Sequence, residues 1–160
     1  MTSNHDRAST LVSALRAGIE RDLDTLRTLL SDDVKAWTPT FSAGSLDDVL
    51  QELAGPANVF SELALDATPL DVSGDFACVE WTVEGTHTGE LRLGEQLSIE
   101  ATGIRITIHG VTVAEFDGER ICSLRQYWDE FAALEQLGVS LDATTPPPAD
   151  VTDASADHAV

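Results

Sequence analysis

The chain has 160 residues, which suits one domain with a core of useful size. Hydrophobic residues make up 42% of it, and no apolar run approaches the roughly 18 residues that a membrane span needs. The first residues, MTSNHDRAST, lack the apolar segment of a signal peptide, so we expect a cytoplasmic protein.

The charge balance is strongly acidic. The chain carries 28 acidic residues and 9 basic residues, a formal net charge of −19. Such a field repels phosphate backbones and anionic lipid, so we expect no nucleic-acid partner and no membrane partner. Lys35 is the one lysine, and acidity with so little lysine indicates a halophilic host with high internal salt. An acidic surface that binds a partner is the alternative explanation.

Neither the cysteines nor the motifs indicate a metal or a cofactor. Cys78 and Cys122 are too few for a disulfide framework, form no CxxC pair and fall in predicted strands, which favours buried reduced thiols. No spacing of His, Cys and carboxylate residues suggests a metal site, and no glycine-rich phosphate loop occurs.

The first third of the chain is predicted to be mainly helical. Apolar residues at helical spacing predict a long helix over 10–30, with a break near Gly18. A short strand over 34–37 follows, and Ser45 is predicted to cap a second helix that ends at about Leu53.

The period then changes to that of strands. Strands are predicted over 60–72, 76–85, 99–116 and 121–128. Apolar and polar residues alternate along them, so one face of the sheet is apolar and we expect the sheet to be covered on that side only. Gly110 is predicted to mark a bulge or bend in the longest strand. A closing helix follows a cap at Asp129, with one face formed by Phe131, Leu134 and Leu137.

Helices followed by antiparallel strands predict an α+β domain over 1–140, with the N-terminal helices packed on the concave face of a curved, mostly antiparallel sheet. Such an arrangement leaves a conical cavity between the two layers. Residues 141–160 are rich in Pro, Ala, Asp and Thr and are predicted to form a disordered acidic tail.

The chain resembles the nuclear-transport-factor-2-like (NTF2-like) superfamily and, within it, the SnoaL-like polyketide cyclases. The resemblance covers about residues 8–140 and rests on four stretches: LLSDDVKAWTP after the opening helix, WTVEGTHTGEL, GVTVAEFDGERI and YWDEFAALEQLG. It implies a cone-shaped fold. The superfamily includes ketosteroid isomerases, limonene-epoxide-hydrolase-like enzymes, cofactor-independent cyclases and many non-catalytic binding proteins.

The resemblance also implies where the chemistry would lie. Isomerase relatives carry a base just before the proline and an acid on the long strand, at positions that match Thr38 and Thr112, and these hydroxyls disfavour ketosteroid-type isomerisation. In cyclases and epoxide hydrolases the acid lies three residues before the capping Asp, which is Gln126 here. If the alignment shifts, Asp129 is the acid; otherwise Asp129 is mainly a helix cap.

Strand alternation provides a second test of these candidates. If Gln126 faces the cavity, so do Cys122, Leu124 and Trp128, and Arg125 and Tyr127 face outward. His109 suits acid–base catalysis but opposes the isoleucine face, so it faces outward unless the bend at Gly110 rotates it. His87 is expected to support a turn.

Trp37, Trp81 and Trp128 lie on three different strands, and aromatic walls with few polar groups suit a flat hydrophobic ligand.

Three functions follow as expectations. The first is a cofactor-independent cyclase or isomerase that binds a small apolar carbonyl compound, positioned by Gln126, Thr38 and Thr112, with Asp129 or His109 moving the proton. The second is a non-catalytic binding or assembly domain, and the third is a limonene-epoxide-hydrolase-like enzyme. An exposed sheet face bearing Trp or Val would favour a homodimer.

Overall fold

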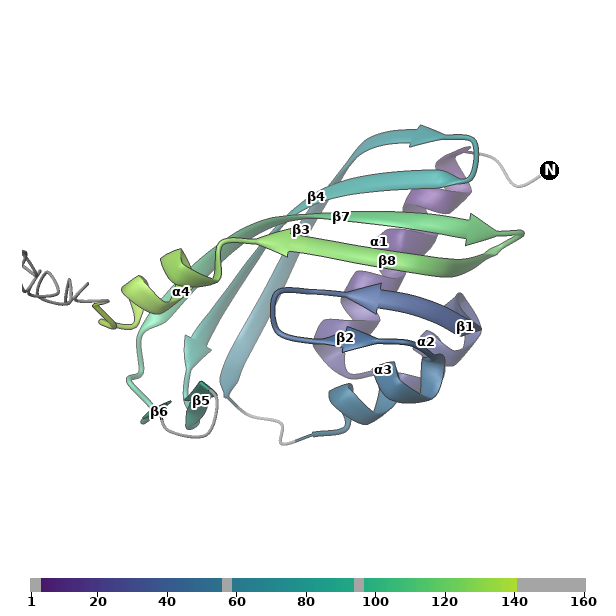
Figure 1. Ribbon diagram of the computed structural model, residues 1–160. Coiled ribbons are helices and arrows are strands. Elements are labelled where there is room, and N and C mark those ends of the chain that lie inside the picture. Colours follow the sequence, from purple (N-terminus) through teal and green to yellow (C-terminus); the bar gives the residue numbers. More distant parts are fainter. Residues whose placement is uncertain (1–3, 56–58, 94–96, 141–160) are drawn as a thin grey trace, which may run out of the picture.

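The computed structural model describes residues 4–55, 59–93 and 97–140, so the expected tail over 141–160 lies outside the described residues (Figure 1). The described part contains helices and strands in the predicted order. The helices are α1 (Asn4–Glu20), α2 (Leu23–Leu29), α3 (Leu46–Leu53) and α4 (Glu130–Gln136). The strands are β1 (Leu30–Trp37), β2 (Ser42–Ala43), β3 (Phe60–Ser73), β4 (Phe76–His87), β5 (Leu91–Leu93), β6 (Leu97–Ile99), β7 (Arg105–Asp117) and β8 (Arg120–Trp128).

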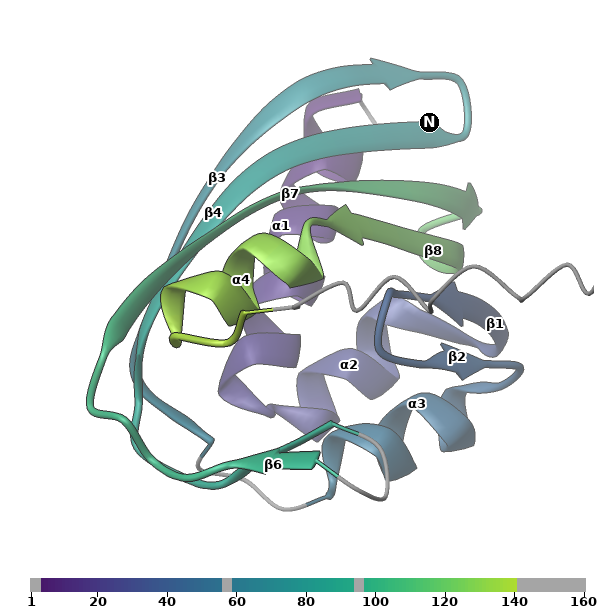
Figure 2. The same cartoon turned by 60° about the vertical axis from the view of Figure 1, so that its left-hand side comes forward.

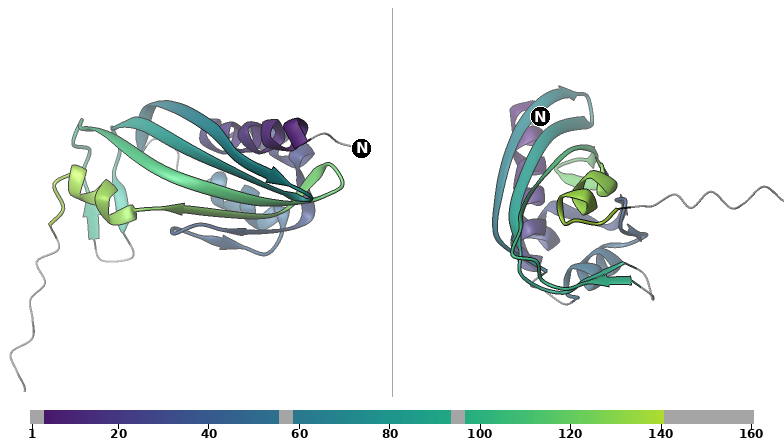
Figure 3. Two further views of the ribbon diagram at one scale, coloured as in Figure 1. Left: turned by 90° about the horizontal axis from the view of Figure 1, so that it is seen from above. Right: turned by 90° about the vertical axis from the view of Figure 1, so that its left-hand side faces the viewer.

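Six strands form one curved sheet in the order β2-β1-β8-β7-β4-β3. Every neighbouring pair is antiparallel except β1 and β8, which run parallel, and β5 and β6 form a separate hairpin. The sheet wraps around α1, α2 and α3, which lie on its concave side (Figures 2 and 3). This confirms the predicted α+β class and the placement of the N-terminal helices.

The core lies between α1 and the sheet. Leu11 of α1, Val34 of β1 and Ile121 of β8 are fully buried there. At the start of α1, Arg7 forms an ion pair with Asp75 at 2.8 Å and lies over the ring of Phe116, 5.5 Å from its centroid. One guanidinium therefore links α1 to the β3–β4 turn and to β7.

The first helix breaks three residues later than expected. Gly18 lies inside α1, and the break falls at Arg21, whose backbone has a φ of 56°. Asp22 then caps α2 by accepting a hydrogen bond from the backbone N–H of Thr25 at 3.0 Å. A side-chain cap and one left-handed residue, rather than a glycine, end the first helix.

The predicted long strand over 99–116 starts too early. Ile99 belongs to the short hairpin, and β7 begins at Arg105. Of the predicted bulge or bend at Gly110, the bulge is absent, because β4 and β7 stay in continuous register from the pair Phe76–Glu115 to the pair Thr86–Arg105. Gly110 is required for a different reason, which is the approach of Trp81 described below.

Helix α4 is held at both ends. Asp129 caps it by accepting a hydrogen bond from the backbone N–H of Ala132 at 3.0 Å, which confirms the predicted cap. At the other end, the Gln136 amide accepts from the N–H of Thr107 and donates to its C=O, both at 2.9 Å. Strand β8 pairs with β7 only as far as Gly110, so Gln136 occupies backbone groups of β7 that β8 does not reach.

Candidate functional site

A cavity of about 390 Å³ lies between the concave face of the sheet and the helices. Most of its lining side chains are apolar and come from α1, β1, α3, β4, β7, β8 and α4, such as Leu15, Val83, Ile108 and Leu134. This volume and this apolar lining are typical of small-molecule sites, which combine hydrophobic walls with a few placed polar groups.

Two of the three tryptophans form one wall of the cavity, as expected. The rings of Trp81 and Trp128 lie 6.1 Å apart at 59°. The indole N–H of Trp81 donates a hydrogen bond to the hydroxyl of Thr112 at 2.9 Å, and both residues are buried. The Trp81 ring lies so close over Gly110 that a Cβ there would be 2.3 Å from a ring carbon. The ring is therefore fixed from two sides.

The hydroxyl of Thr112 does not reach the cavity. Thr112 is fully buried behind Trp81, and it is not among the residues that line the cavity. Its role in the structure is to accept the indole N–H, which would otherwise be a buried unpaired donor. The expected contact of Thr112 with a ligand is thus replaced by an indirect role through Trp81.

Gln126 faces the cavity from β8, between Leu124 and Trp128, which also line it. No hydrogen bond joins its side-chain amide to another of the described residues. The pairing of Trp37 with Arg125 in β1 and β8 places Thr38 beside Gln126 at the ends of two parallel strands. Thr38 and Gln126, which the resemblance singled out on different strands, therefore lie side by side, and the Gln126 amide has no partner among the described residues.

Thr38 lines the cavity, but its hydroxyl holds the turn between β1 and β2. Its oxygen accepts hydrogen bonds from the backbone N–H of Thr40 at 3.2 Å and of Phe41 at 3.0 Å. A hydroxyl that is engaged in this way has little capacity left for a ligand. Thr40, which also lines the cavity, was not predicted.

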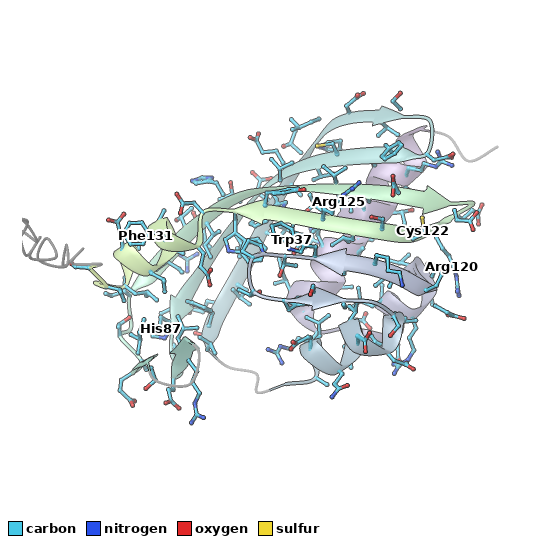
Figure 4. All side chains as sticks on the ribbon, viewed as in Figure 1. Trp37, His87, Arg120, Cys122, Arg125 and Phe131 are labelled. Carbon is cyan, nitrogen blue, oxygen red and sulfur yellow. The ribbon has the colours of Figure 1, made fainter. Side chains whose placement is uncertain are left out.

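The face that α4 turns toward the cavity contains two of the three residues of the predicted apolar face, Leu134 and Leu137, but not Phe131. Phe131 is 38% exposed and points away from the fold (Figure 4). Glu130, Ala133, Leu134 and Leu137 line the cavity instead, at the spacing of one helical face. Asp129 is absent from the lining, and its carboxylate is occupied by the cap.

Glu130 is another cavity residue that the sequence analysis did not predict. Among the described residues that line the cavity, it is the one with an ionisable side chain. The signal that would have found it is the helical spacing from Leu137 back through Leu134 and Ala133, which reaches position 130 rather than position 131.

Three further candidates lie on the outer face of the sheet. Trp37 projects from β1 on the side opposite α1 and packs against Tyr127, with ring centroids 5.2 Å apart (Figure 4). Arg125 lies on the same side, as strand alternation predicted. His109 is exposed and its Nδ1 lies 3.0 Å from the hydroxyl of Thr82. Neither Trp37 nor His109 lines the cavity, because both have the outward parity of their strands.

His87 is fully buried at the end of β4. Its Nδ1 lies 3.3 Å from the backbone N–H of Thr102, which donates to it, and its ring packs against Phe60 at 5.4 Å. These contacts hold the connection between the short hairpin and β7, which agrees with the expected support of a turn.

The cysteine thiols are half-buried, and no metal site is seen in the described part of the chain. Burial raises the pKa of both Cys78 and Cys122, with smaller contributions from nearby carboxylates, so neither thiol forms a thiolate readily.

No group of three or more His, Cys, Asp or Glu side chains in 4–55, 59–93 and 97–140 is arranged to hold a metal ion. Among the same residues, no helix is both long and apolar enough to cross a membrane.

A curved, mostly antiparallel sheet with N-terminal helices on its concave side, and an apolar cavity between them, defines the chain as a cone-shaped NTF2-like fold. The family model of the SnoaL-like polyketide cyclases matches residues 9–137, and the chain belongs to this family. A search of curated proteins returned no match.

Solved structures show the same fold at low sequence identity. TsrD from Streptomyces laurentii is 20% identical with a TM-score of 0.71, over 86% of this chain and 98% of that one. A limonene-epoxide-hydrolase-like (LEH-like) enzyme from M. tuberculosis is 18% identical with a TM-score of 0.58, over 83% and 90%. A protein of ketosteroid-isomerase-like fold from Catenulispora acidiphila, in complex with trimethylamine, is 16% identical with a TM-score of 0.64, over 82% and 93%.

Proposed function

We propose that the cavity binds a small apolar compound that carries a carbonyl group, and that Gln126 is its anchor. The observation that carries this proposal is the free amide of Gln126 in a cavity of about 390 Å³ whose walls are almost entirely apolar. A carbonyl oxygen that accepts from the amide NH₂ provides the missing partner. Trp81 and Trp128 supply a rigid aromatic wall for a flat molecule.

Membership of the SnoaL-like family supports a cofactor-independent cyclase or isomerase. An epoxide hydrolase is less well supported, because that chemistry needs both an acid and a second group that activates water, and the described lining contains one ionisable residue, Glu130. A non-catalytic binding protein would use the same cavity without proton transfer, and the exchange experiment below separates the two.

Binding of a bicyclic ketone tests the proposal. With about 11 non-hydrogen atoms at about −0.5 kcal/mol each, β-tetralone is expected to bind with a Kd of about 0.1 mM. The readout is fluorescence of Trp81 and Trp128 in a Trp37→Phe variant, because Trp37 lies outside the cavity. Tetralin, which has the same rings without the carbonyl, is expected to bind several-fold more weakly, since it leaves the amide unpaired. Equal affinities, or no saturable signal with β-tetralone, would contradict the proposal.

We also propose that two copies associate through the outer face of β1, β7 and β8. Trp37 and Tyr127 are 44% and 50% exposed there, although they form a stacked aromatic pair. On the same side of the sheet, Glu115 pairs with Arg125 at 3.9 Å and Glu84 pairs with Arg105 at 2.9 Å. In a chain of net charge −19, the pairing of these two carboxylates with arginines lowers the repulsion between two copies at this face.

The double variant Trp37→Ser/Tyr127→Ser is expected to convert the dimer into a monomer of 17.1 kDa in sedimentation or light-scattering measurements. Burial of large aromatic side chains dominates the free energy of such interfaces. Leu70→Ser, which removes an exposed side chain from β3 at the far edge of the sheet, is the matched control and leaves the dimer intact. Added salt is expected to strengthen wild-type association by screening the acidic charge. A wild-type monomer at all salt concentrations would refute this proposal.

A further inference from the structure

Among the described acidic residues, Glu130 is the one that lines the cavity. It lines the apolar cavity from the first turn of α4, and among the described residues no hydrogen bond or ion pair reaches its carboxylate. An ionisable group beside an apolar cavity that is engaged by no neighbour is available to a bound molecule.

The backbone around Glu130 is held firmly. Asp129 caps the helix immediately before it, and the Gln136 amide pins the last turn to Thr107 through two hydrogen bonds of 2.9 Å. Ala133, Leu134 and Leu137 pack into the same cavity on the face that carries Glu130. The fold therefore holds this helical face, which carries Glu130, along the border of the cavity.

Gln126 completes the arrangement. It lies on β8 just before the cap, so the junction of β8 with α4 presents a neutral donor and a carboxylate to one cavity. A donor aimed at a carbonyl oxygen stabilises the negative charge that develops there when a neighbouring carbon loses a proton. A carboxylate within reach is the group that takes this proton.

We propose that Glu130 is the general base of this site and abstracts a proton from the carbon next to the carbonyl held by Gln126; the inference rests on the proposed function. The C–H bond breaks and an O–H bond forms on Glu130. The C–H electron pair becomes the new C=C bond, and the carbonyl electron pair moves to the oxygen, which accepts from the Gln126 amide.

The reaction class follows from the rest of the lining. Since Glu130 is the one ionisable group among the described residues of the lining, we infer that the same carboxyl returns the proton to the substrate, either to the original carbon or to another. The site would thus carry out proton transfer within one enolisable carbonyl compound. The described lining offers no second acid or base to activate water for attack on an epoxide.

Hydrogen–deuterium exchange of β-tetralone in deuterium oxide, followed by proton NMR, tests this step. Wild-type protein is expected to accelerate exchange at the carbons beside the carbonyl above the buffer rate. Glu130→Gln keeps the shape and removes the base, so the acceleration is expected to fall by about 100-fold or more. Glu130→Asp is expected to retain part of it. Glu135→Gln, at an exposed position on α4 outside the cavity lining, is the matched control and keeps the wild-type rate.

Binding of β-tetralone, measured by tryptophan fluorescence on the same variants, separates the possible failures. Binding that is unchanged in Glu130→Gln together with loss of exchange supports the inference. Wild-type protein that binds the ketone without accelerating exchange, or a Glu130→Gln variant that exchanges at the wild-type rate, overturns the inference and leaves the proposed function standing. Wild-type protein that does not bind the ketone overturns the proposed function as well.

Discussion

Gly110→Ala is expected to destabilise the protein by about 3 kcal/mol or more and to weaken ligand binding. The new methyl group would lie 2.3 Å from the Trp81 ring, which is rigid and cannot move without losing its hydrogen bond to Thr112. Overpacking costs about 1 to 3 kcal/mol, and a buried unpaired indole N–H adds a similar amount. Thermal unfolding should show a decrease in Tm of roughly 10 °C for a chain of this length.

Gly18→Ala is the matched control and has the opposite expected sign. Gly18 lies inside α1, and a Cβ at this position meets no atom within 4 Å. Alanine in a helix interior is favoured over glycine by about 0.5 to 1 kcal/mol, so Tm should rise. If Gly110→Ala were as stable as wild type, the close approach of Trp81 would not be a feature of the folded protein.

Gln126→Leu is expected to weaken binding of β-tetralone about 5- to 150-fold, which corresponds to about 1 to 3 kcal/mol for a carbonyl left without its donor. The affinity for tetralin should stay the same or increase, because leucine keeps the volume and extends the apolar wall. Stability should not fall, since the amide makes no hydrogen bond to other described residues of the chain. The measurements are fluorescence titration with both compounds and thermal unfolding.

Gln51→Leu provides the control for this substitution. Gln51 lies at an exposed position on α3 and outside the cavity lining, so the same change of side chain should leave both affinities unaltered. Equal losses for β-tetralone and tetralin in Gln126→Leu would indicate a change in cavity shape and would argue against a carbonyl anchor.

The start of β7 and the role of Gly110 could not be predicted for one physical reason. Strand period and a glycine are local signals, and they predicted a strand from Ile99 with a bulge or bend at Gly110. The strand starts at Arg105 because residues 97–99 pair with β5 instead, and Gly110 faces a tryptophan from the neighbouring strand. The start of β7 and the requirement for Gly110 both depend on residues of neighbouring strands, and the alternation of residues within β7 carries no information about those neighbours.

The cavity face of α4 illustrates a similar limit. Three apolar residues beginning at Phe131 formed a plausible stripe, yet the true face begins at Glu130, one residue earlier. Hydrophobicity favours Phe131 for the buried side, but the cap at Asp129 and the pin at Gln136 fix the rotation of the helix. The hydrogen bonds at the two ends of this short helix therefore keep Leu134 and Leu137 at the cavity and leave Phe131 outside it.

The stretch from the β7–β8 turn to the end of α4 shows what the amino-acid sequence determined by itself. Alternation, the cap at Asp129 and the order of helices and strands are set by local backbone preferences, so the curved sheet, the inward Gln126 and the outward Tyr127 could all be predicted. Only the tertiary structure decided which polar groups remain free. It paired Thr112 with Trp81 and left the side chains of Gln126 and Glu130 without a partner among the described residues, because such hydrogen-bond partners come from strands and helices that are distant in the chain.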